Sequence, residues 1–234
     1  MSEVLISGKH SFKTEVPYKI IETGRKEPKP LILYLHGFNQ NIGRFENDCS
    51  RLTKSVAAYH LFIQGPYPIY DRSRSKNVSE WGRAWYLYDG NRSQFIKSLE
   101  ITSQFLQDIV DQLLPHIQVT RMGVTGYSMG GYLAGYFAFT RWKHVNDLIA
   151  IGCRLKTEIL NEKWDHLKHM HILAIHGKGD TSVSAENQLK EIDYLKNHDI
   201  DAELKMLDEG HRLSDSYIEE VIVWLNQKGY KKID

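Results

Sequence analysis

The sequence predicts an α/β fold with a mostly parallel central sheet and helices on both faces. Segments with the apolar pattern of buried strands alternate with helix-like segments, which is typical of parallel sheets joined by right-handed crossovers. The chain has 234 residues and 41% hydrophobic content, enough for one sizeable core, and its composition does not change abruptly along its length. We therefore expect one domain, residues 1–234.

The individual elements follow from apolar periodicity and turn residues. Strand-like patterns occur at 18–22, 30–35, 59–63, 119–125, 147–151, 171–177 and 202–207. Helical spacing occurs at 44–57, 94–114, 132–140, 186–197 and 213–227. The helix over 94–114 has the clearest apolar stripe, with Phe95, Leu99 and Leu106 on one face, and Pro115 ends it. Because no insertion is long, we expect no large lid domain.

The most informative motif is a G-x-S-x-G pattern, Gly126-Tyr127-Ser128-Met129-Gly130, between a predicted strand and a predicted helix. In this context the serine stands at the apex of a sharp strand-to-helix turn, the nucleophile elbow of α/β-hydrolases. The crowded backbone requires positions without a Cβ on either side. An ordinary glycine-rich turn explains the pattern equally well, so the assignment of Ser128 as a nucleophile depends on its partners.

Those partners occur downstream in the chain order that α/β-hydrolases use, serine, then acid, then histidine. Asp180 follows the strand predicted at 171–177, and His211 follows the strand predicted at 202–207. A serine needs a base to remove its proton, and the base needs an acid that holds its tautomer. Two alternatives remain: Asp180 as an Asx-turn residue that caps the next helix, and Asp208 as the acid.

An oxyanion hole is expected after the strand predicted at 30–35. In this fold the loop after that strand and the residue after the nucleophile each supply a backbone N–H. The sequence thus nominates the amides of Phe38 and Met129. We expect Gly37 to let the main chain approach a substrate carbonyl, and His36 to shape the loop rather than act as a second base.

The chain resembles the phospholipase/carboxylesterase family, small α/β-hydrolases that include acyl-protein thioesterases and bacterial carboxylesterases. The resemblance is carried by the segments 35–38, 126–131, 176–180 and 209–211, and it spans roughly residues 30 to 228. The thioesterase members usually have glutamine where this chain has Met129. The resemblance implies a cofactor-free serine carboxylesterase with Ser128, Asp180 and His211 as the triad, acting on small or medium acyl or aryl esters. Alternatives are an acyl-thioesterase or lysophospholipase, a prolyl-oligopeptidase-like peptidase, and a catalytically silent binding protein.

The segment 65–93 is long for a loop and rich in aromatic residues and arginine. We expect Trp81, Trp85 and Tyr86 to form a substrate-binding wall near Ser128. The alternative is that these rings pack the loop onto the body of the protein. The same segment contains Arg72, Arg74 and Arg83, for which we favour solvation over contact with an anionic substrate.

Composition excludes several classes of function. A net charge of +1, with both signs mixed along the chain, gives no basis for nucleic-acid or membrane-surface binding. No apolar run is long enough for a membrane span, and residues 1–7 do not resemble a signal peptide, so we expect a cytoplasmic protein. The partner that the resemblance implies is a small-molecule ester substrate. Cys49 and Cys153 are expected to be unpaired thiols. His166, His169 and His171 are close in sequence, but no further ligand completes a set, so we expect no metal site. Homodimer formation is left open.

Overall fold

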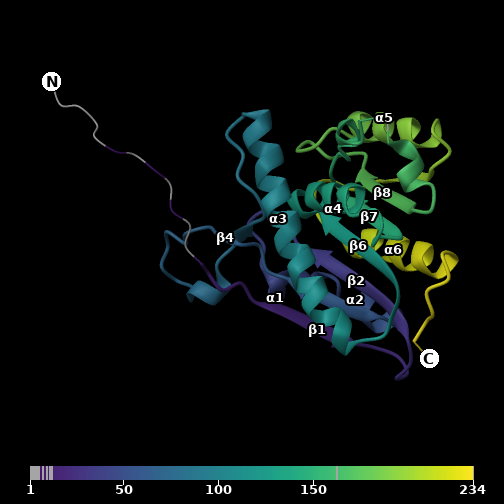
Figure 1. Ribbon diagram of the computed structural model, residues 1–234, viewed down its shortest axis with the longest axis horizontal. Helices are drawn as coiled ribbons and strands as arrows, with labels where there is room; N and C mark the ends of the chain where they lie inside the picture. The colour runs from purple at the N-terminus through teal and green to yellow at the C-terminus, as the bar shows by residue number, and fades with distance from the viewer. Residues whose placement is uncertain (1–5, 7, 9, 11–12, 162, 234) are drawn as a thin grey trace.

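The computed structural model describes residues 6, 8, 10, 13–161 and 163–233, and its centre is a seven-stranded sheet (Figure 1). The strand order is β1-β3-β2-β6-β7-β8-β9. The strands are β1 (Tyr18–Glu22), β2 (Lys29–Leu35), β3 (Tyr59–Ile63), β6 (Val119–Tyr127), β7 (Asp147–Ile151), β8 (His171–Gly177) and β9 (Asp201–Leu207). Only β1 runs antiparallel to its neighbour within this sheet. The remaining strands, β4 (Tyr67–Pro68) and β5 (Arg83–Ala84), form a small separate hairpin.

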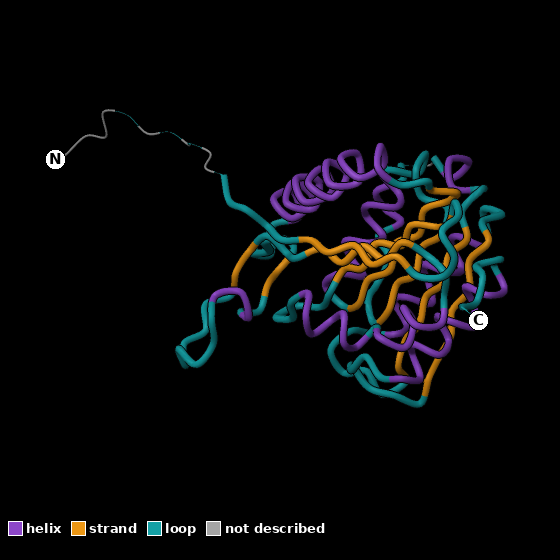
Figure 2. The backbone as a smooth tube through the Cα atoms, turned by 90° about the horizontal axis from the view of Figure 1, so that it is seen from below, coloured by secondary structure: helices purple, strands orange, loops and turns teal. Residues whose placement is uncertain are grey.

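Helices cover both faces of the sheet, which Figure 2 shows with the strands in orange between helices in purple. One core cluster joins the sheet to α3 (Arg92–Leu113), α4 (Met129–Thr140) and α5 (Ala185–Lys196). The opposite cluster joins it to α1 (Ile42–Asp48), α2 (Ser50–Ser55) and α6 (Asp215–Gln227). Short 3-10 turns are η1 (Val78–Glu80), η2 (Leu114–His116), η3 (Thr157–Ile159) and η4 (Trp164–Leu167). This confirms the predicted fold class, and the described residues contain no large lid.

Burial on both faces explains why the central strands are almost continuously apolar. All five residues of β7 are buried, and in β2 every residue except Pro30 is buried. Parallel strands that are covered by helices on both sides have this pattern, in contrast to the alternating pattern of a half-exposed sheet. The predicted strands therefore agree closely with the observed ones.

The expected single helix over 44–57 is wrong: the structure has two helices there. Asn41 caps α1 by accepting a hydrogen bond from the Arg44 amide, so α1 begins earlier than expected. Cys49, with φ −94° and ψ 6°, then interrupts the helical path before α2 begins. Apolar spacing did not detect the break because Phe45 and Leu52, on either side of it, are both buried against the same sheet face.

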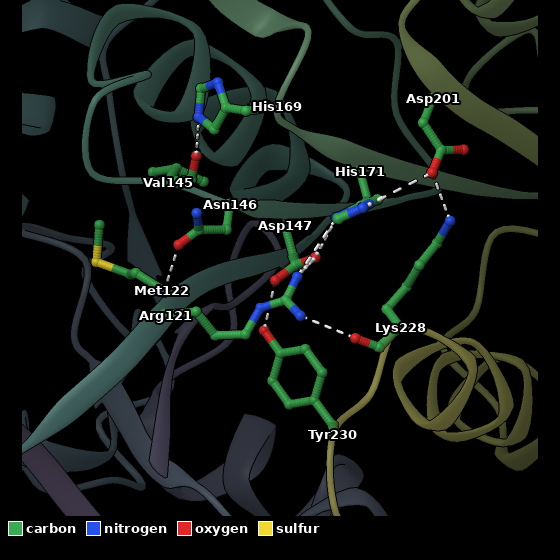
Figure 3. A network of polar contacts seen from close by, with 10 residues as sticks. All are labelled: Arg121, Met122, Val145, Asn146, Asp147, His169, His171, Asp201, Lys228 and Tyr230. Carbon is green, nitrogen blue, oxygen red and sulfur yellow. Dashed lines mark hydrogen bonds and ion pairs between the residues drawn. The ribbon is translucent and has the colours of Figure 1, made fainter. Parts of the chain in front are cut away.

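A polar network ties the amino ends of the central strands to the carboxyl-terminal segment (Figure 3). Asp147, fully buried at the start of β7, accepts from the Arg121 guanidinium at 2.5 Å and from the Tyr230 hydroxyl at 2.8 Å. Nδ1 of His171 lies 3.1 Å from the same carboxylate. The network is at the edge of the sheet opposite to the strand ends that precede Ser128, Asp180 and His211.

Among the helices of residues 13–161 and 163–233, none has a sufficiently long apolar stretch to cross a bilayer. The predicted absence of a signal peptide concerns residues 1–7, most of which lie outside the described part of the chain. The single domain over 1–234 stays a prediction.

Candidate active site

Ser128 stands at a strained turn between β6 and α4. Its φ of 51° and ψ of −116° are unusual for a residue with a side chain, and such strain is characteristic of functional turns. A Cβ on Gly126 would overlap the Gly130 carbonyl, and one on Gly130 would overlap the Leu35 carbonyl. Both glycines of the motif are thus required by the close approach of backbone, as the sequence predicted.

The structure brings the three predicted triad residues into contact. Nε2 of His211 lies 2.9 Å from Oγ of Ser128, and Nδ1 of His211 lies 2.7 Å from Oδ2 of Asp180. The three side chains come from the carboxyl ends of β6, β8 and β9, which are brought to one edge of the sheet by their parallel direction. The arrangement can remove a proton from the serine and hold it on the imidazole.

Asp180 combines the two roles that the sequence presented as alternatives. Its Oδ1 accepts hydrogen bonds from the amides of Ser182 and Val183, as in an Asx turn, while Oδ2 faces His211. Burial favours the neutral carboxyl, but the bonds from His211, Val183 and Ser182 outweigh it, so the pKa of Asp180 is below its usual value. The rival acid, Asp208, is exposed and pairs with Lys178 at 2.8 Å.

Two residues that were not among the predicted site residues support the triad: Tyr127 contacts the loop of the histidine, and His176 contacts the loop of the acid. The Tyr127 hydroxyl donates to the backbone carbonyl of His211 at 2.9 Å, and the two rings lie 5.4 Å apart. Nε2 of the buried His176 lies 2.9 Å from the Val183 carbonyl and 3.3 Å from Oδ2 of Asp180. Tyr127 directly precedes Ser128, and His176 is the first residue of the segment 176–180. Their position beside predicted triad residues was the signal that could have identified them.

The amides of Phe38 and Met129 have no hydrogen-bond acceptor among the described residues, as expected of oxyanion donors. The loop that carries Phe38 is fixed from both sides. Oε1 of Gln40 accepts from the Gly37 amide at 2.7 Å, and the Arg83 carbonyl accepts from the Asn39 amide at 3.0 Å. The β4–β5 hairpin thus holds this loop, a function of the segment 65–93 that its composition does not reveal.

His36 shapes the same loop in its neutral form. Its Nε2 accepts from the Gly65 amide at 3.0 Å, and Nδ1 therefore carries the proton and donates to the Gly37 carbonyl at 2.8 Å. Burial lowers the pKa of His36 to about 4, against the opposing effect of the Gly37 bond. A buried neutral histidine with both nitrogens engaged agrees with the predicted shaping role.

The predicted aromatic wall is wrong for Trp85. Its side chain has 0% exposure, and the indole nitrogen donates to the His36 carbonyl at 2.7 Å, so Trp85 supports the loop from inside the core. Trp81 is half-buried, packs edge-on against Tyr70 and donates to the Lys76 carbonyl, and it does not line the Ser128 cavity. Trp81 lies away from the cavity because β4 and the loop after it project from the body of the protein (Figure 1).

Tyr86, the third predicted wall residue, lines a cavity of about 530 Å³ together with Tyr88, Phe95, Tyr132 and Lys156. Tyr132 lies one helical turn beyond Ser128, whose carbonyl accepts its amide at 3.1 Å. This cavity is therefore close to the elbow, although the substrate contact of Tyr86 stays a prediction.

The arginines of the segment 65–93 agree with the solvated interpretation in two cases. Arg72 and Arg74 are exposed, and neither lines the cavity that contains Ser128. Arg83 is half-buried, and its guanidinium donates to the Val78 carbonyl at 3.1 Å within the hairpin.

The Ser128 cavity itself has a volume of about 520 Å³. It is lined by Phe38, Asn39, Gln40, Arg44, Asp48, Tyr127, Ser128, Ser182, His211, Arg212 and Leu213. Polar and charged side chains dominate this lining, in contrast to the aromatic wall that the sequence predicted. Arg44 and Arg212 had no motif to mark them, because they come from distant elements that meet only in the folded chain.

The neighbouring histidines do not converge. His169 faces the Val145 carbonyl and His171 faces Asp147 (Figure 3), while His166 stacks on Trp142. Within the described residues, no group of histidine, cysteine and acidic side chains could hold a metal ion. The two cysteine thiols are unpaired and buried.

Comparison with known proteins places this geometry among serine hydrolases. A family model described as "Serine hydrolase (FSH1)" matches residues 26–215. Acyl-protein thioesterase 2 from Zea mays is 17% identical, with a TM-score of 0.68, covering 90% of this chain and 98% of that one. Esterase PE8 is 17% identical, with a TM-score of 0.73, covering 92% and 99%. The Bacillus cereus carboxylesterase is 15% identical, with a TM-score of 0.67, covering 91% and 94%. No curated protein matches the sequence. At these identities the similar structures confirm the expected α/β-hydrolase fold.

Proposed function

Because the chain belongs to the FSH1 serine hydrolase family, we propose that it is a carboxylesterase that cleaves small or medium acyl or aryl esters through an acyl-enzyme on Ser128. The observation that supports this most strongly is the continuous series of contacts from Ser128 through His211 to Asp180, at 2.9 Å and 2.7 Å. This is the arrangement that a hydroxyl needs to become a nucleophile at neutral pH.

In the first half-reaction, Nε2 of His211 takes the Ser128 proton while Oγ attacks the ester carbonyl. The C–O bond to the leaving group breaks as His211 returns the proton to the leaving alcohol. Asp180 keeps the proton of the neutral imidazole on Nδ1 and stabilises the imidazolium that forms. The amides of Phe38 and Met129 donate to the oxyanion, and removal of one such donor typically costs about two to three orders of magnitude in turnover.

In the second half-reaction, His211 takes a proton from water, which attacks the acyl-enzyme. The tetrahedral intermediate collapses to release the free acid, and the proton returns to Ser128. Every step uses groups of this chain and water, so the proposed reaction needs no cofactor.

A thioester is the second candidate substrate, because attack on a thioester uses the same oxyanion donors and the same acyl-enzyme. The similarity in fold to an acyl-protein thioesterase supports this alternative. A peptidase would have to expel an amine, a poorer leaving group than an alcohol or a thiol, and a binding protein would not need the intact contacts among Ser128, His211 and Asp180. The last two alternatives are therefore less well supported.

The experiment that tests the proposal is hydrolysis of 4-nitrophenyl esters from acetate to palmitate by the wild type and by Ser128→Ala. We expect activity towards short or medium chains in the wild type and its loss in the variant. Comparison of phenyl acetate with phenyl thioacetate separates esterase from thioesterase preference.

Labelling with a fluorophosphonate gives an independent readout of the nucleophile. Ser128→Ala should abolish labelling, and Ser216→Ala, which removes an exposed serine on α6, should retain it. A wild-type protein that neither labels nor hydrolyses any ester would contradict the proposal.

A further inference from the structure

The Ser128 cavity contains two arginines that the proposed mechanism does not use. Arg44 lies in the first turn of α1, and Arg212 lies in the loop between β9 and α6, directly after His211. Both side chains line the cavity of about 520 Å³ that also contains Ser128 and His211. Two elements that are distant in the sequence thus bring two cations to the cavity of the candidate nucleophile.

Neither guanidinium has a direct ion-pair or hydrogen-bond partner among the described residues, whereas Arg154, for example, pairs with Glu158 at 2.7 Å. Arg44 and Arg212 do lie close enough to Asp48 to counter the rise in the pKa of its carboxyl that burial causes. Both arginines are exposed, so their charges are available to a molecule that enters the cavity. A guanidinium has a planar set of N–H donors that matches the oxygens of a carboxylate or phosphate.

The carboxylate in the same cavity does not cancel this charge. Asp48 is half-buried and its Oδ2 accepts a hydrogen bond from Nε2 of Gln40 at 2.9 Å. Burial raises the pKa of Asp48, in spite of the opposing effects of Arg44, the Gln40 bond and Arg212. Asp48 is hydrogen-bonded by Gln40 and by neither arginine, and one carboxylate cannot balance two guanidinium groups, so the cavity keeps an excess of positive charge beside Ser128.

The neighbouring cavity differs in this respect. Its Lys156 lies 3.7 Å from Glu158, a carboxylate of the same cavity, and its Arg92, which has no ion-pair partner among the described residues, has no second guanidinium beside it in the cavity lining. An anionic group of a substrate therefore has unpaired guanidinium groups available in the Ser128 cavity.

We propose that Arg44 and Arg212 form an anion-binding subsite, and that the substrate is an ester or thioester with a second, ionised acid group. The inference rests on the proposed function and names its substrate class. The charged group belongs either to the acyl part, as in a half-ester of a dicarboxylic acid, or to the leaving group. Both cases share one chemistry, an oxyacid anion held by guanidinium groups while Oγ of Ser128 attacks the ester carbonyl.

The test uses two pairs of esters that are matched in size and differ in charge. Mono-4-nitrophenyl adipate and methyl 4-nitrophenyl adipate vary the acyl side. Then 4-acetoxybenzoate and methyl 4-acetoxybenzoate vary the leaving group. The value of kcat/KM is measured for the wild type, Arg44→Gln, Arg212→Gln and the double variant. Arg51→Gln is the matched control, since Arg51 is an exposed arginine on α2 that pairs with Glu219 and does not line the cavity.

We expect the wild type to prefer the charged member of at least one pair, which identifies the side that carries the anion. Each cavity variant should lower kcat/KM for that charged ester by roughly tenfold, because a hydrogen bond to an ionised group is lost. The neutral ester should be unaffected, and the control should behave as wild type. Added salt should slow only the charged ester. Equal effects on charged and neutral esters, or no preference in either pair, would overturn the subsite.

A binding measurement keeps the subsite separate from the proposed reaction. Adipate should raise the thermal midpoint of the wild type and not that of the double variant, whether or not any ester is cleaved. If adipate stabilises the wild type selectively while all esters remain intact, the proposed esterase activity fails and the subsite stands. If the neutral esters are cleaved and adipate has no selective effect, the subsite fails and the esterase stands.

Discussion

Nδ1 of His211 lies 2.7 Å from Oδ2 of Asp180, a carboxylate whose side chain has no exposed surface. The other oxygen of this carboxylate accepts the amides of Ser182 and Val183, which prevent it from rotating away from the imidazole. These bonds overcome the effect of burial and lower the pKa of Asp180, so the acid is ionised across the range in which histidine is neutral. The imidazole is thereby held with Nε2 towards Ser128.

This relationship predicts that Asp180→Asn lowers kcat by about 10⁴-fold, because an amide at this position no longer selects the tautomer with Nε2 free. Steady-state hydrolysis of a 4-nitrophenyl ester measures the effect. Asp208→Asn is the matched control, since Asp208 also follows a strand and precedes His211 but pairs with the exposed Lys178. A larger loss of activity in Asp208→Asn than in Asp180→Asn would reverse the assignment of the acid.

The second prediction concerns the hairpin that supports the oxyanion loop. A Cβ at Gly82 would overlap Oδ1 of Asn39, and its other near neighbours are the backbone of Asn39. We expect Gly82→Ala to displace the loop that carries the Phe38 amide and to lower kcat by about tenfold to a hundredfold, part of the loss that follows removal of one oxyanion donor. KM should change less, because the donor acts mainly on the transition state.

The control for this substitution is Gly43→Ala, because a Cβ there meets its nearest neighbour at 3.7 Å, an ordinary contact. Both variants should fold, which a thermal unfolding curve checks. A Gly82→Ala enzyme with wild-type kcat would show that the hairpin does not control the position of the loop.

The third prediction follows from the burial of Trp85. Trp85→Phe removes the hydrogen bond to the His36 carbonyl and leaves a buried acceptor unpaired, so the free energy of unfolding should fall by about 1 to 3 kcal/mol. The preference among acyl chains should stay as in the wild type, because this side chain has no surface that a substrate could contact. Urea unfolding and the ester series measure the two quantities. A shifted chain-length preference without loss of stability would restore the wall interpretation.

The elements and the triad could be predicted because their signals are local or sequential. Apolar periodicity identified strands such as β7, whose bounds agree with the prediction, since burial on both faces imposes a continuous apolar run. The order of Ser128, Asp180 and His211 along the chain identified three strand ends that the parallel sheet brings to one edge. Neither signal requires knowledge of how loops pack.

The cavity lining could not be predicted because it depends on contacts between distant loops. Trp85 and Trp81 lie in one aromatic segment, and nothing in that segment indicates that Trp85 turns into the core while Trp81 packs within the projecting hairpin. Arg44 and Arg212 reach the same cavity from separate elements and have no shared motif. Similarly, the break at Cys49 lies between two apolar stripes that continue in phase.

The last prediction concerns His60, a buried histidine on β3 that lies outside the candidate site. Its Nδ1 accepts from the Tyr34 hydroxyl at 2.8 Å, and Nε2 lies 3.1 Å from the Val56 carbonyl, so the neutral ring satisfies both contacts. Burial lowers the pKa of His60 to about 4, in spite of the Val56 bond. In the unfolded chain a histidine has a pKa near 6.5. Between pH 6.5 and about 4 the unfolded state therefore binds a proton that the folded state does not.

Because of this proton, His60 lowers the free energy of unfolding as the pH decreases through that window, by roughly 1.4 kcal/mol per pH unit. Above about pH 6.5 His60 makes no such contribution. His36, whose pKa is also lowered to about 4, adds a contribution of the same sign. Urea unfolding at intervals from pH 7 to pH 4.5 should show a smaller loss of stability in His60→Gln than in the wild type. His116→Gln, which replaces an exposed histidine, should follow the wild type. Identical pH dependence in wild type and His60→Gln would mean that His60 takes up its proton equally in the folded and unfolded states.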